Sequence, residues 1–437
     1  MPKNVYIYTF GCQMNIHDSE KMIGLLSENG YALTENPENA DLIIFNTCAI
    51  REKAEQKFYS QLGRAKILKK KNKDLKIVAA GCVAQAAKEK IFQKAPFVDY
   101  ILGPQNIHMI NDLLSRKQGI ATGENHNIAL NEFTAGRQSN IKAWVSIMYG
   151  CNNFCSYCIV PYTRGREVSR PSSSIKAEIK ELARQGYQEV TLLGQNVNSY
   201  QSDIGFVDLL KQIDDVYPGR VRFVTSHPRD FSVDLINAIS ELESLCEHIH
   251  LPLQSGSDSV LKAMNRGYAY EEYRKKIALL RDKIPNIAIT TDIISGFPGE
   301  TDEDYLDTVT ALKEIEFDGI FAFKYSKRSG TKACEMPGQI PDQIKSERLA
   351  CILSLQEDIT FKKNKALEGS IQEVLIEGPS ATDPHMLSGR TRTNKIVTSP
   401  NSSEKIGSVV SIRIQKARRH SLHGVNVSTE TVLAAEQ

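Results

Sequence analysis

Three cysteines stand within eight positions of one another, at Cys151, Cys155 and Cys158. Thiolates are ligands of zinc and of iron–sulfur clusters, and three of them on one short loop can share a metal centre. Three thiolates do not complete a four-cysteine site, so a cluster bound here keeps one iron without a protein ligand. That iron is open to a substrate or a cofactor. The spacing therefore predicts an iron–sulfur site with one exchangeable position.

Two other interpretations of this loop are weaker. A structural zinc site takes four ligands, usually as two pairs, but neither a second pair nor a nearby histidine follows Cys158. A disulfide with a spare thiol is typical of small secreted domains. This chain is long and lysine-rich, and its first ten residues resemble a strand, without the apolar core of a secretory signal. We therefore expect reduced thiols that are available for iron.

A second set of cysteines follows three separate strand-like runs, at Cys12, Cys48 and Cys82. The runs cover residues 5–10, 41–46 and 76–80, with helical stretches expected over 18–29 and 52–71. Alternating strands and helices predict a parallel sheet, in which the carboxyl ends of the strands share one edge. Cysteines that follow those ends are therefore predicted to converge on a second three-thiolate site. The alternative is three unrelated buried cysteines.

The alternation of strands and helices begins again near Lys142. Strands are expected over residues 142–149, 189–193, 221–225, 248–253, 288–294 and 320–324, with helices between them. Six such units predict an open (β/α)6 partial barrel, whose functional face lies at the carboxyl ends of its strands. The first cysteine loop follows the first of these strands, and polar residues follow the others. This face is therefore the expected site of chemistry.

The composition changes after Gly369, where five short strands are expected within about seventy residues. That pattern predicts a small OB-like β-barrel, a fold that often binds oligonucleotides. Between His385 and His420 the only acidic residue is Glu404, so the barrel carries a basic surface for RNA or, alternatively, a solubilising cap. The candidate RNA-binding residues are Arg390, Arg392, Lys395, Arg418 and Arg419.

The predicted fold class is thus α/β with three parts. Residues 1–118 form a parallel-sheet domain, 119–136 a linker, 137–367 the partial barrel and 368–437 the small β-barrel. The formal net charge of the 437-residue chain is only +2, so any nucleic-acid binding must come from local patches. No apolar stretch reaches transmembrane length, and we expect a cytoplasmic protein without a membrane partner.

The first cysteine motif, with Tyr157 before its last cysteine, resembles that of the radical S-adenosylmethionine (SAM) enzymes. In that family the open iron binds SAM, and reduction of the cluster cleaves SAM to a 5′-deoxyadenosyl radical. The resemblance implies that Gln195, Gln254 and Asp292 lie near SAM and that Tyr157 lies near its adenine.

With its strand-end cysteines and its basic terminal barrel, the whole chain resembles the methylthiotransferase family, in which that barrel is the TRAM domain. The strings that carry this resemblance are Gly11-Cys12-Gln13-Met14-Asn15, Asn46-Thr47-Cys48-Ala49-Ile50-Arg51-Glu52-Lys53-Ala54 and Cys158-Ile159-Val160-Pro161-Tyr162-Thr163-Arg164-Gly165. They are similar to the branch that adds a methylthio group to C2 of N6-isopentenyl(dimethylallyl)adenosine, next to the anticodon of tRNA.

The resemblance implies two 4Fe–4S clusters and SAM as cofactors. One cluster would hold sulfur and accept a methyl group, while the other would cleave SAM. It implies the tRNA anticodon stem-loop, an electron donor such as a flavodoxin or ferredoxin, and the iron–sulfur assembly machinery as partners of a monomer. Sister branches act on threonylcarbamoyl-adenosine in tRNA or on an aspartate of a ribosomal protein. A non-catalytic iron–sulfur or RNA-binding protein is the alternative outside the enzymes, and it would need no SAM pocket.

Overall fold

A computed structural model describes residues 2–49, 52–130, 135–401 and 404–427. The N-terminal part is a six-stranded parallel sheet in the order β2-β1-β3-β4-β5-β6. Its strands are β1 (Lys3–Thr9), β2 (Tyr31–Leu33), β3 (Leu42–Thr47), β4 (Lys76–Gly81), β5 (Tyr100–Leu102) and β6 (Gly119–Ala121). Its helices are α1 (Gln13–Ser27), α2 (Glu52–Lys71), α3 (Cys82–Ala87), α4 (Lys90–Lys94) and α5 (Ile110–Leu114).

Helices cover both faces of this sheet, and β3 is buried along its whole length. Alternate residues of β3 point to opposite faces, so Ile43 lies in the core beneath α2, whereas Ile44 lies in the core beneath α1 and α5. Burial on both faces is the reason that a continuous apolar run forms a strand here. The parallel sheet predicted from the sequence is confirmed.

The strands β2, β5 and β6 were not expected from the sequence. Each has only three residues, which is too short for a clear apolar pattern. One of them corrects the predicted linker. Gly119 begins β6, which pairs with Tyr100 of β5, so the first residues assigned to the linker belong to the sheet. A three-residue edge strand that begins with glycine gives little strand signal in a sequence.

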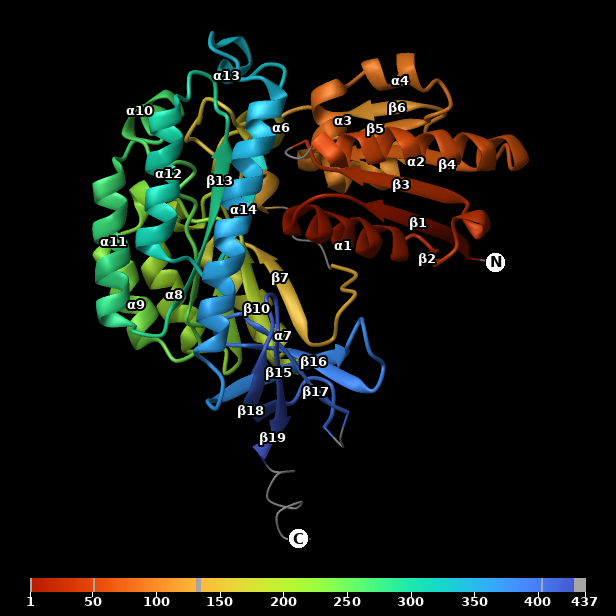
Figure 1. Ribbon diagram of the computed structural model, residues 1–437. Helices are drawn as coiled ribbons and strands as arrows, with labels where there is room; N and C mark the ends of the chain where they lie inside the picture. The colour runs from red at the N-terminus through yellow and green to blue at the C-terminus, as the bar shows by residue number, and fades with distance from the viewer. Residues whose placement is uncertain (1, 50–51, 131–134, 402–403, 428–437) are drawn as a thin grey trace.

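The middle part is an open partial barrel of parallel strands with helices outside it (Figure 1). Its strands form two sheets, β11-β10-β7 and β12-β13-β14, which a bridge between Val221 and Leu245 connects. The strands are β7 (Lys142–Ser146), β10 (Glu189–Leu193), β11 (Arg220–Phe223), β12 (His248–His250), β13 (Ala288–Ser295) and β14 (Gly319–Lys324). The edges are β7 and β14, so the barrel is open between them.

One apolar core joins both sheets of the barrel to the surrounding helices. These are α7 (Ser172–Arg184), α8 (Phe206–Asp214), α9 (Val233–Glu241), α10 (Asp258–Ala263), α11 (Tyr270–Lys283), α12 (Asp302–Ile315) and the long α14 (Asp342–Lys365). The first predicted strand of this part divides at Ile147 into β7 and β8 (Met148–Tyr149). The second piece pairs with β9 (Val168–Ser169) outside the barrel.

The C-terminal part is a closed five-stranded barrel in the order β15-β16-β17-β19-β18, as the sequence predicted. Its strands are β15 (Ile371–Pro379), β16 (Met386–Thr391), β17 (Ile396–Pro400), β18 (Val409–Ala417) and β19 (Leu422–Asn426). Figure 1 shows this barrel at the lower end of the partial barrel, while α6 (Val160–Arg164) and α3 meet at the upper end.

Candidate functional site

The first three cysteines lie at one edge of the N-terminal sheet. Cys12 precedes α1 and Cys48 follows β3, while Cys82 is the first residue of α3, after β4. A hydrogen bond from the Cys48 thiol lowers the pKa of Cys12 to about 6, so these two side chains touch. Burial raises the pKa of Cys82, and the charge of Cys12 acts in the same direction. The structure therefore brings these cysteines to one edge of the sheet, while their binding of a cluster stays a prediction.

Glycines at the strand ends make room for this edge. Gly11 has φ +120°, and a Cβ there would lie 2.2 Å from the Cβ of Cys48. Gly81 has φ +87°, and its Cβ would lie 2.4 Å from the backbone oxygen of Thr47. Only glycine accepts such a backbone and such a close approach at low cost. Each glycine directly precedes a cysteine and lets the chain turn over the sheet.

Buried amides support the same cysteines from α1 and β3. Asn15 Oδ1 accepts a hydrogen bond from Cys12 Sγ at 3.2 Å, and Asn15 Nδ2 donates to Asn46 Oδ1 at 3.1 Å. Asn46 Nδ2 in turn donates to Ser19 Oγ at 2.9 Å. Asn15 and Asn46 belong to the sequence strings that carry the resemblance to the methylthiotransferases. In the structure their side chains hydrogen-bond to each other and to Cys12, which gives these amides a role beside the cysteines.

The second cysteine set forms the loop between β8 and α6. Gly150 (φ +70°) opens this loop, where a Cβ would lie 2.0 Å from the backbone oxygen of Arg166. Burial raises the pKa of Cys151 to about 11 and that of Cys158 to about 12. Arg266, which is buried, donates from Nη1 to Cys155 Sγ at 3.3 Å. Iron would replace the protons of these thiols.

Both sets fit iron–sulfur clusters better than a single metal ion. Among the described residues, no group of three or more His, Cys, Asp or Glu side chains is close enough to hold one ion. The cysteine ligands of a cluster bind separate irons and therefore stand further apart. All nine cysteines lie in described segments, and none forms a disulfide. Cys246, Cys334 and Cys351 are outside both sets.

Polar atoms without partners mark a ligand position at the carboxyl ends of the barrel strands. Within the described part of the chain, Asn196 Oδ1, Ser226 Oγ, His227 Nε2 and Ser295 Oγ are buried and make no hydrogen bond. They follow or end β10, β11 and β13. Buried polar atoms are nearly always paired, so these four are candidates for contact with a polar ligand. Ser295, the last residue of β13, is not marked by any motif in the sequence.

Of the four residues expected near SAM, two are adjacent in the structure and two lie on other elements. Gln254 has φ +74°, and its backbone N–H donates to the Asp292 carbonyl oxygen at 2.8 Å, so these two residues are adjacent. Gln195 is half-buried after β10, on the other sheet of the barrel. Tyr157 packs with Phe297 and Tyr325 in an apolar cluster. Their contacts with SAM stay a prediction.

An aromatic side chain that the sequence reading missed lies on the inner face of β14. Phe321 pairs in register with Asp292, and its ring meets the ring of His250 edge to face at 5.7 Å. His250 Nε2 lies 3.5 Å from Asp292 Oδ2. Phe321 is 51% exposed on the edge strand β14. An accessible aromatic ring beside the opening between β7 and β14 is suited to stacking on a base.

Two of the predicted RNA-binding residues, Arg392 and Lys395, join the two barrels instead, and Arg390 pairs with a carboxylate of its own barrel. Arg392 Nε lies 2.8 Å from Glu247 Oε2, Lys395 Nζ lies 3.1 Å from Asp318 Oδ1, and Arg390 Nε lies 3.5 Å from Glu377 Oε1. Such engaged side chains are poor candidates for binding phosphate, because RNA would first have to displace a carboxylate. That is a correction to the sequence reading.

Two of the predicted RNA-binding residues remain exposed. Arg418 lies on the surface after β18, and its neighbour Arg419 pairs with Glu357 at 2.6 Å while its side chain stays 64% exposed. Exposed ion pairs contribute little and exchange easily. RNA contact by Arg418 and Arg419 therefore stays a prediction.

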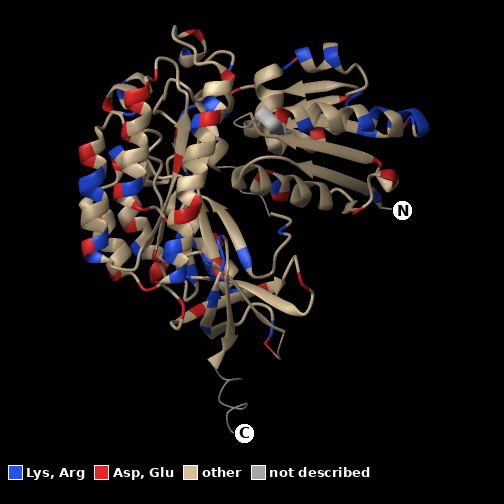
Figure 2. Ribbon diagram, viewed as in Figure 1, with Lys and Arg blue, Asp and Glu red and all other residues tan. Residues whose placement is uncertain are grey.

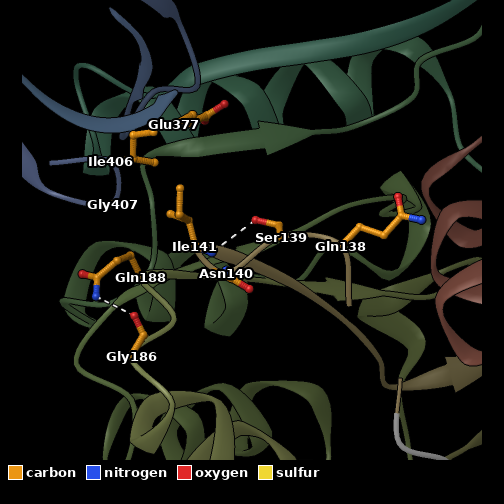
Figure 3. A pocket seen from close by; sticks show the side chains of 9 residues that line it. All are labelled: Gln138, Ser139, Asn140, Ile141, Gly186, Gln188, Glu377, Ile406 and Gly407. Atoms are coloured by element: carbon orange, nitrogen blue, oxygen red, sulfur yellow. Dashed lines mark hydrogen bonds between the residues drawn. The ribbon is translucent and has the colours of Figure 1, made fainter. Parts of the chain in front are cut away.

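A separate cavity of about 550 Å³ lies between the start of β7 and the C-terminal barrel (Figure 3). Its lining is mostly polar and includes Gln138, Asn140, Gln188 and Glu377. It contains none of the cysteines and none of the residues expected to bind SAM. The chemistry assigned above therefore does not take place in this cavity.

Comparison with known families divides the chain in the same way. Residues 4–103 match an uncharacterised protein family, UPF0004, residues 145–312 match the Radical SAM superfamily, and residues 365–427 match the TRAM domain. No helix in the described segments is long and apolar enough to cross a membrane.

Similar proteins cover the whole chain. It is 53% identical to the tRNA-2-methylthio-N(6)-dimethylallyladenosine synthase of Thermodesulfovibrio yellowstonii, over 97% of this chain and 99% of that protein. It is 48% identical to that of Syntrophus aciditrophicus, over 99% and 96%. The radical SAM methyltransferase TsrM of Kitasatospora setae shares the fold, with a TM-score of 0.57 over 87% of this chain and 80% of that one at 13% identity. The chain therefore belongs to the tRNA-2-methylthio-N(6)-dimethylallyladenosine synthase family within the radical SAM superfamily.

Proposed function

We propose that this protein adds a methylthio group to C2 of N6-dimethylallyladenosine, next to the anticodon of tRNA. One observation carries the proposal: the chain holds two sets of three cysteines, and the helix α6, which follows the second set, packs against α3, which begins with Cys82 of the first set. Members of this family use 4Fe–4S clusters and SAM, and two such sets match two clusters. A protein that only stored a cluster would not need the second set or the ligand position at the strand ends.

The bound clusters and SAM would supply the one-electron chemistry and the sulfur that acid–base groups cannot provide at an unreactive C–H position. The chain would hold and shield them. Cys12, Cys48 and Cys82 would hold one cluster, and Cys151, Cys155 and Cys158 the other. Asn196, Ser226, His227 and Ser295 would orient polar groups of SAM at the strand ends. The base would enter unstacked from the anticodon loop, through the opening between β7 and β14.

We further propose that the protein binds the anticodon stem-loop through its TRAM barrel and works as a cytoplasmic monomer. Electrons would come from a flavodoxin or ferredoxin, and clusters from the assembly machinery. The identity of relatives favours dimethylallyladenosine over threonylcarbamoyl-adenosine or a ribosomal-protein aspartate as the substrate. Single-stranded loops are the usual targets of proteins that read RNA bases, which agrees with an anticodon loop.

Mass spectrometry of tRNA tests this function. The protein is reconstituted anaerobically with iron and sulfide, given SAM, a reductant and tRNA carrying dimethylallyladenosine, and the tRNA is digested to nucleosides. We expect a methylthio-dimethylallyladenosine peak that disappears in Cys82→Ala and in Cys155→Ala. It should persist in the matched control Cys351→Ala, whose thiol is exposed and outside both sets. Release of 5′-deoxyadenosine without this peak would reject the substrate but keep the radical SAM assignment.

A further inference from the structure

The segment that follows the second cysteine set is built into the N-terminal part. Ile159, next to Cys158, is buried in the same apolar core as Cys82 and Val83. The helix α6 then packs against α3, which begins with Cys82. The six residues 159–164 therefore connect Cys158, the last predicted ligand of the second cluster, to the residues around Cys82, a predicted ligand of the first cluster.

The end of this segment, at Arg164, is fixed by its backbone. Gln105 Nε2 donates to the Arg164 carbonyl oxygen at 2.7 Å. The next residue, Gly165, has φ +77°, and a Cβ there would lie 2.1 Å from that same Gln105 nitrogen. Because the backbone of Arg164 and Gly165 packs directly against the Gln105 side chain, the position of Arg164 relative to the N-terminal sheet is fixed.

The Arg164 side chain reaches the first cysteine set from this anchored position. It is 4% exposed, and its Nη2 donates to Asp18 Oδ2 at 2.7 Å, a carboxylate that is also buried. Its guanidinium is also a hydrogen-bond partner of the Cys82 side chain. The same Nη2 lies 3.5 Å from Asn15 Oδ1, the acceptor of the Cys12 thiol. One cation therefore meets the cysteine set from two sides.

Burying an arginine costs several kcal/mol unless its charge is matched. Among the residues that the structure describes, Asp18 is the carboxylate that forms an ion pair with Arg164, and it does so at Nη2 of the guanidinium. The same guanidinium also interacts with the Cys82 thiol. Four-iron clusters with thiolate ligands carry net negative charge, and their reduction potentials depend on nearby charges and on hydrogen bonds to sulfur.

We propose that Arg164, supplied by the radical SAM part of the chain, is a positioning residue that tunes the cluster of the N-terminal part. Its positive charge favours the reduced state of that cluster and raises its reduction potential, while Asp18 limits the effect. The N-terminal cysteine set is thus incomplete without the neighbouring part. This inference rests on the proposed function only for the presence of the cluster.

A redox titration followed by electron paramagnetic resonance tests it. The background is the full chain with Cys151, Cys155 and Cys158 changed to alanine, so that only the N-terminal cluster is loaded. We expect Arg164→Gln to lower the midpoint potential, Asp18→Asn to raise it, and Arg164→Lys to leave it near the background value. Arg222→Gln, which alters a buried arginine paired with Glu189 at 2.8 Å far from the cysteines, is the matched control and should not shift it.

Opposite shifts distinguish charge tuning from support of the fold, because a loosened site would move both variants in the same direction. Equal shifts, or no shift, would overturn the proposal. If Arg164→Gln fails to load iron, Asp18→Asn decides alone: a higher potential supports the inference, and an unchanged or lower one rejects it. The measurement needs no tRNA, so failure of the proposed substrate would leave its outcome readable.

Discussion

One buried guanidinium stands beside each cysteine set. Arg164 reaches Cys82, and Arg266 donates to Cys155 Sγ at 3.3 Å, and both arginines are 4% exposed. The Arg266 side chain also donates to the Pro252 carbonyl oxygen at 3.0 Å, which holds it in place. A cluster in a site closed to water needs a counter-charge that water cannot give. Each site therefore carries its own buried cation.

Phe321 leads to a prediction about the substrate. Stacking of one base on an aromatic side chain contributes about 1–3 kcal/mol, so we expect Phe321→Ala to raise KM for tRNA about tenfold. Cleavage of SAM without tRNA should change little, because the ring does not lie among the polar atoms at the strand ends. Steady-state assays with varied tRNA measure both quantities. Phe361→Ala, which removes an equally accessible ring from α14, is the control.

An equal loss of SAM cleavage in Phe321→Ala would contradict a role in binding the base. It would show that the ring supports the His250–Asp292 contact instead. In that case Phe321→Ala would reduce turnover of tRNA with the dimethylallyl group and of tRNA without it to the same extent.

At the scale of elements, strand-then-glycine-then-cysteine is the unit that builds the first site. Gly11 and Cys12 follow shortly after β1, Gly81 ends β4 and precedes Cys82, and Thr47 ends β3 between them and precedes Cys48. A parallel sheet brings residues from 70 positions apart to one edge in this way.

Gly11→Ala tests this unit. The new methyl group would meet the Cys48 Cβ, in a backbone conformation that alanine adopts poorly, so the edge must shift. We expect about half of the iron to be lost, while SAM cleavage at the second set continues. Iron analysis and 5′-deoxyadenosine release measure the two. Gly63→Ala in the middle of α2, where no atom lies within 4 Å of the new carbon, should load fully.

Sequence reading succeeded where the pattern is local. The helix 52–71 and the strand 189–193 were predicted with the bounds that the structure has, because the pattern that indicates each lies within the segment itself. It failed where a residue's role depends on a distant partner. The sequence around Arg392 does not indicate that this side chain pairs with Glu247, 145 positions away. The sequence around Arg164 likewise does not indicate that it pairs with Asp18. Composition reports a charge but not its partner.

At the scale of the whole molecule, the two functional ends are far apart in the fold. The TRAM barrel docks at the amino ends of the barrel strands, where Arg222 donates to the backbone oxygens of Thr391 and Arg392 at 2.9 and 2.7 Å. Both cysteine sets lie near the opposite end (Figure 1). If the TRAM barrel binds tRNA as proposed, the tRNA would extend along the side of the partial barrel to reach the cysteine sets. Figure 2 shows another basic region, at the free end of α2.

Asp318 makes this docking dependent on pH. Burial alone would raise its pKa, but the charges of Lys395 and Lys363 lower the pKa of Asp318 below 3.8. A lowered pKa means that the folded state favours the carboxylate. The stabilisation is therefore present above about pH 4 and is lost as the pH falls through the folded-state pKa. We expect Asp318→Asn to lose about 3 kcal/mol at pH 7.

Urea unfolding at several pH values measures this difference. The gap between the native protein and Asp318→Asn should narrow below about pH 4, since both then carry a neutral side chain at this position. Asp342→Asn, whose exposed carboxylate pairs with Lys324, is the control and should cost little at any pH. A gap that stays constant as the pH falls would show that Asp318 acts through its hydrogen bonds and not its charge.

The variant Arg418→Ala tests whether the exposed side of the TRAM barrel binds RNA. A side chain that contacts one phosphate releases about one counterion, so Arg418→Ala should weaken tRNA binding and make the slope of log K against log salt about 0.7–0.9 less steep. Arg274→Ala on α11, another exposed arginine on the far side of the partial barrel, should leave both unchanged. Filter binding between low and moderate salt measures the slopes. An unchanged slope in Arg418→Ala would move the phosphate contacts away from this barrel, and the basic end of α2, with Lys69, Lys70 and Lys71, would become the surface to test.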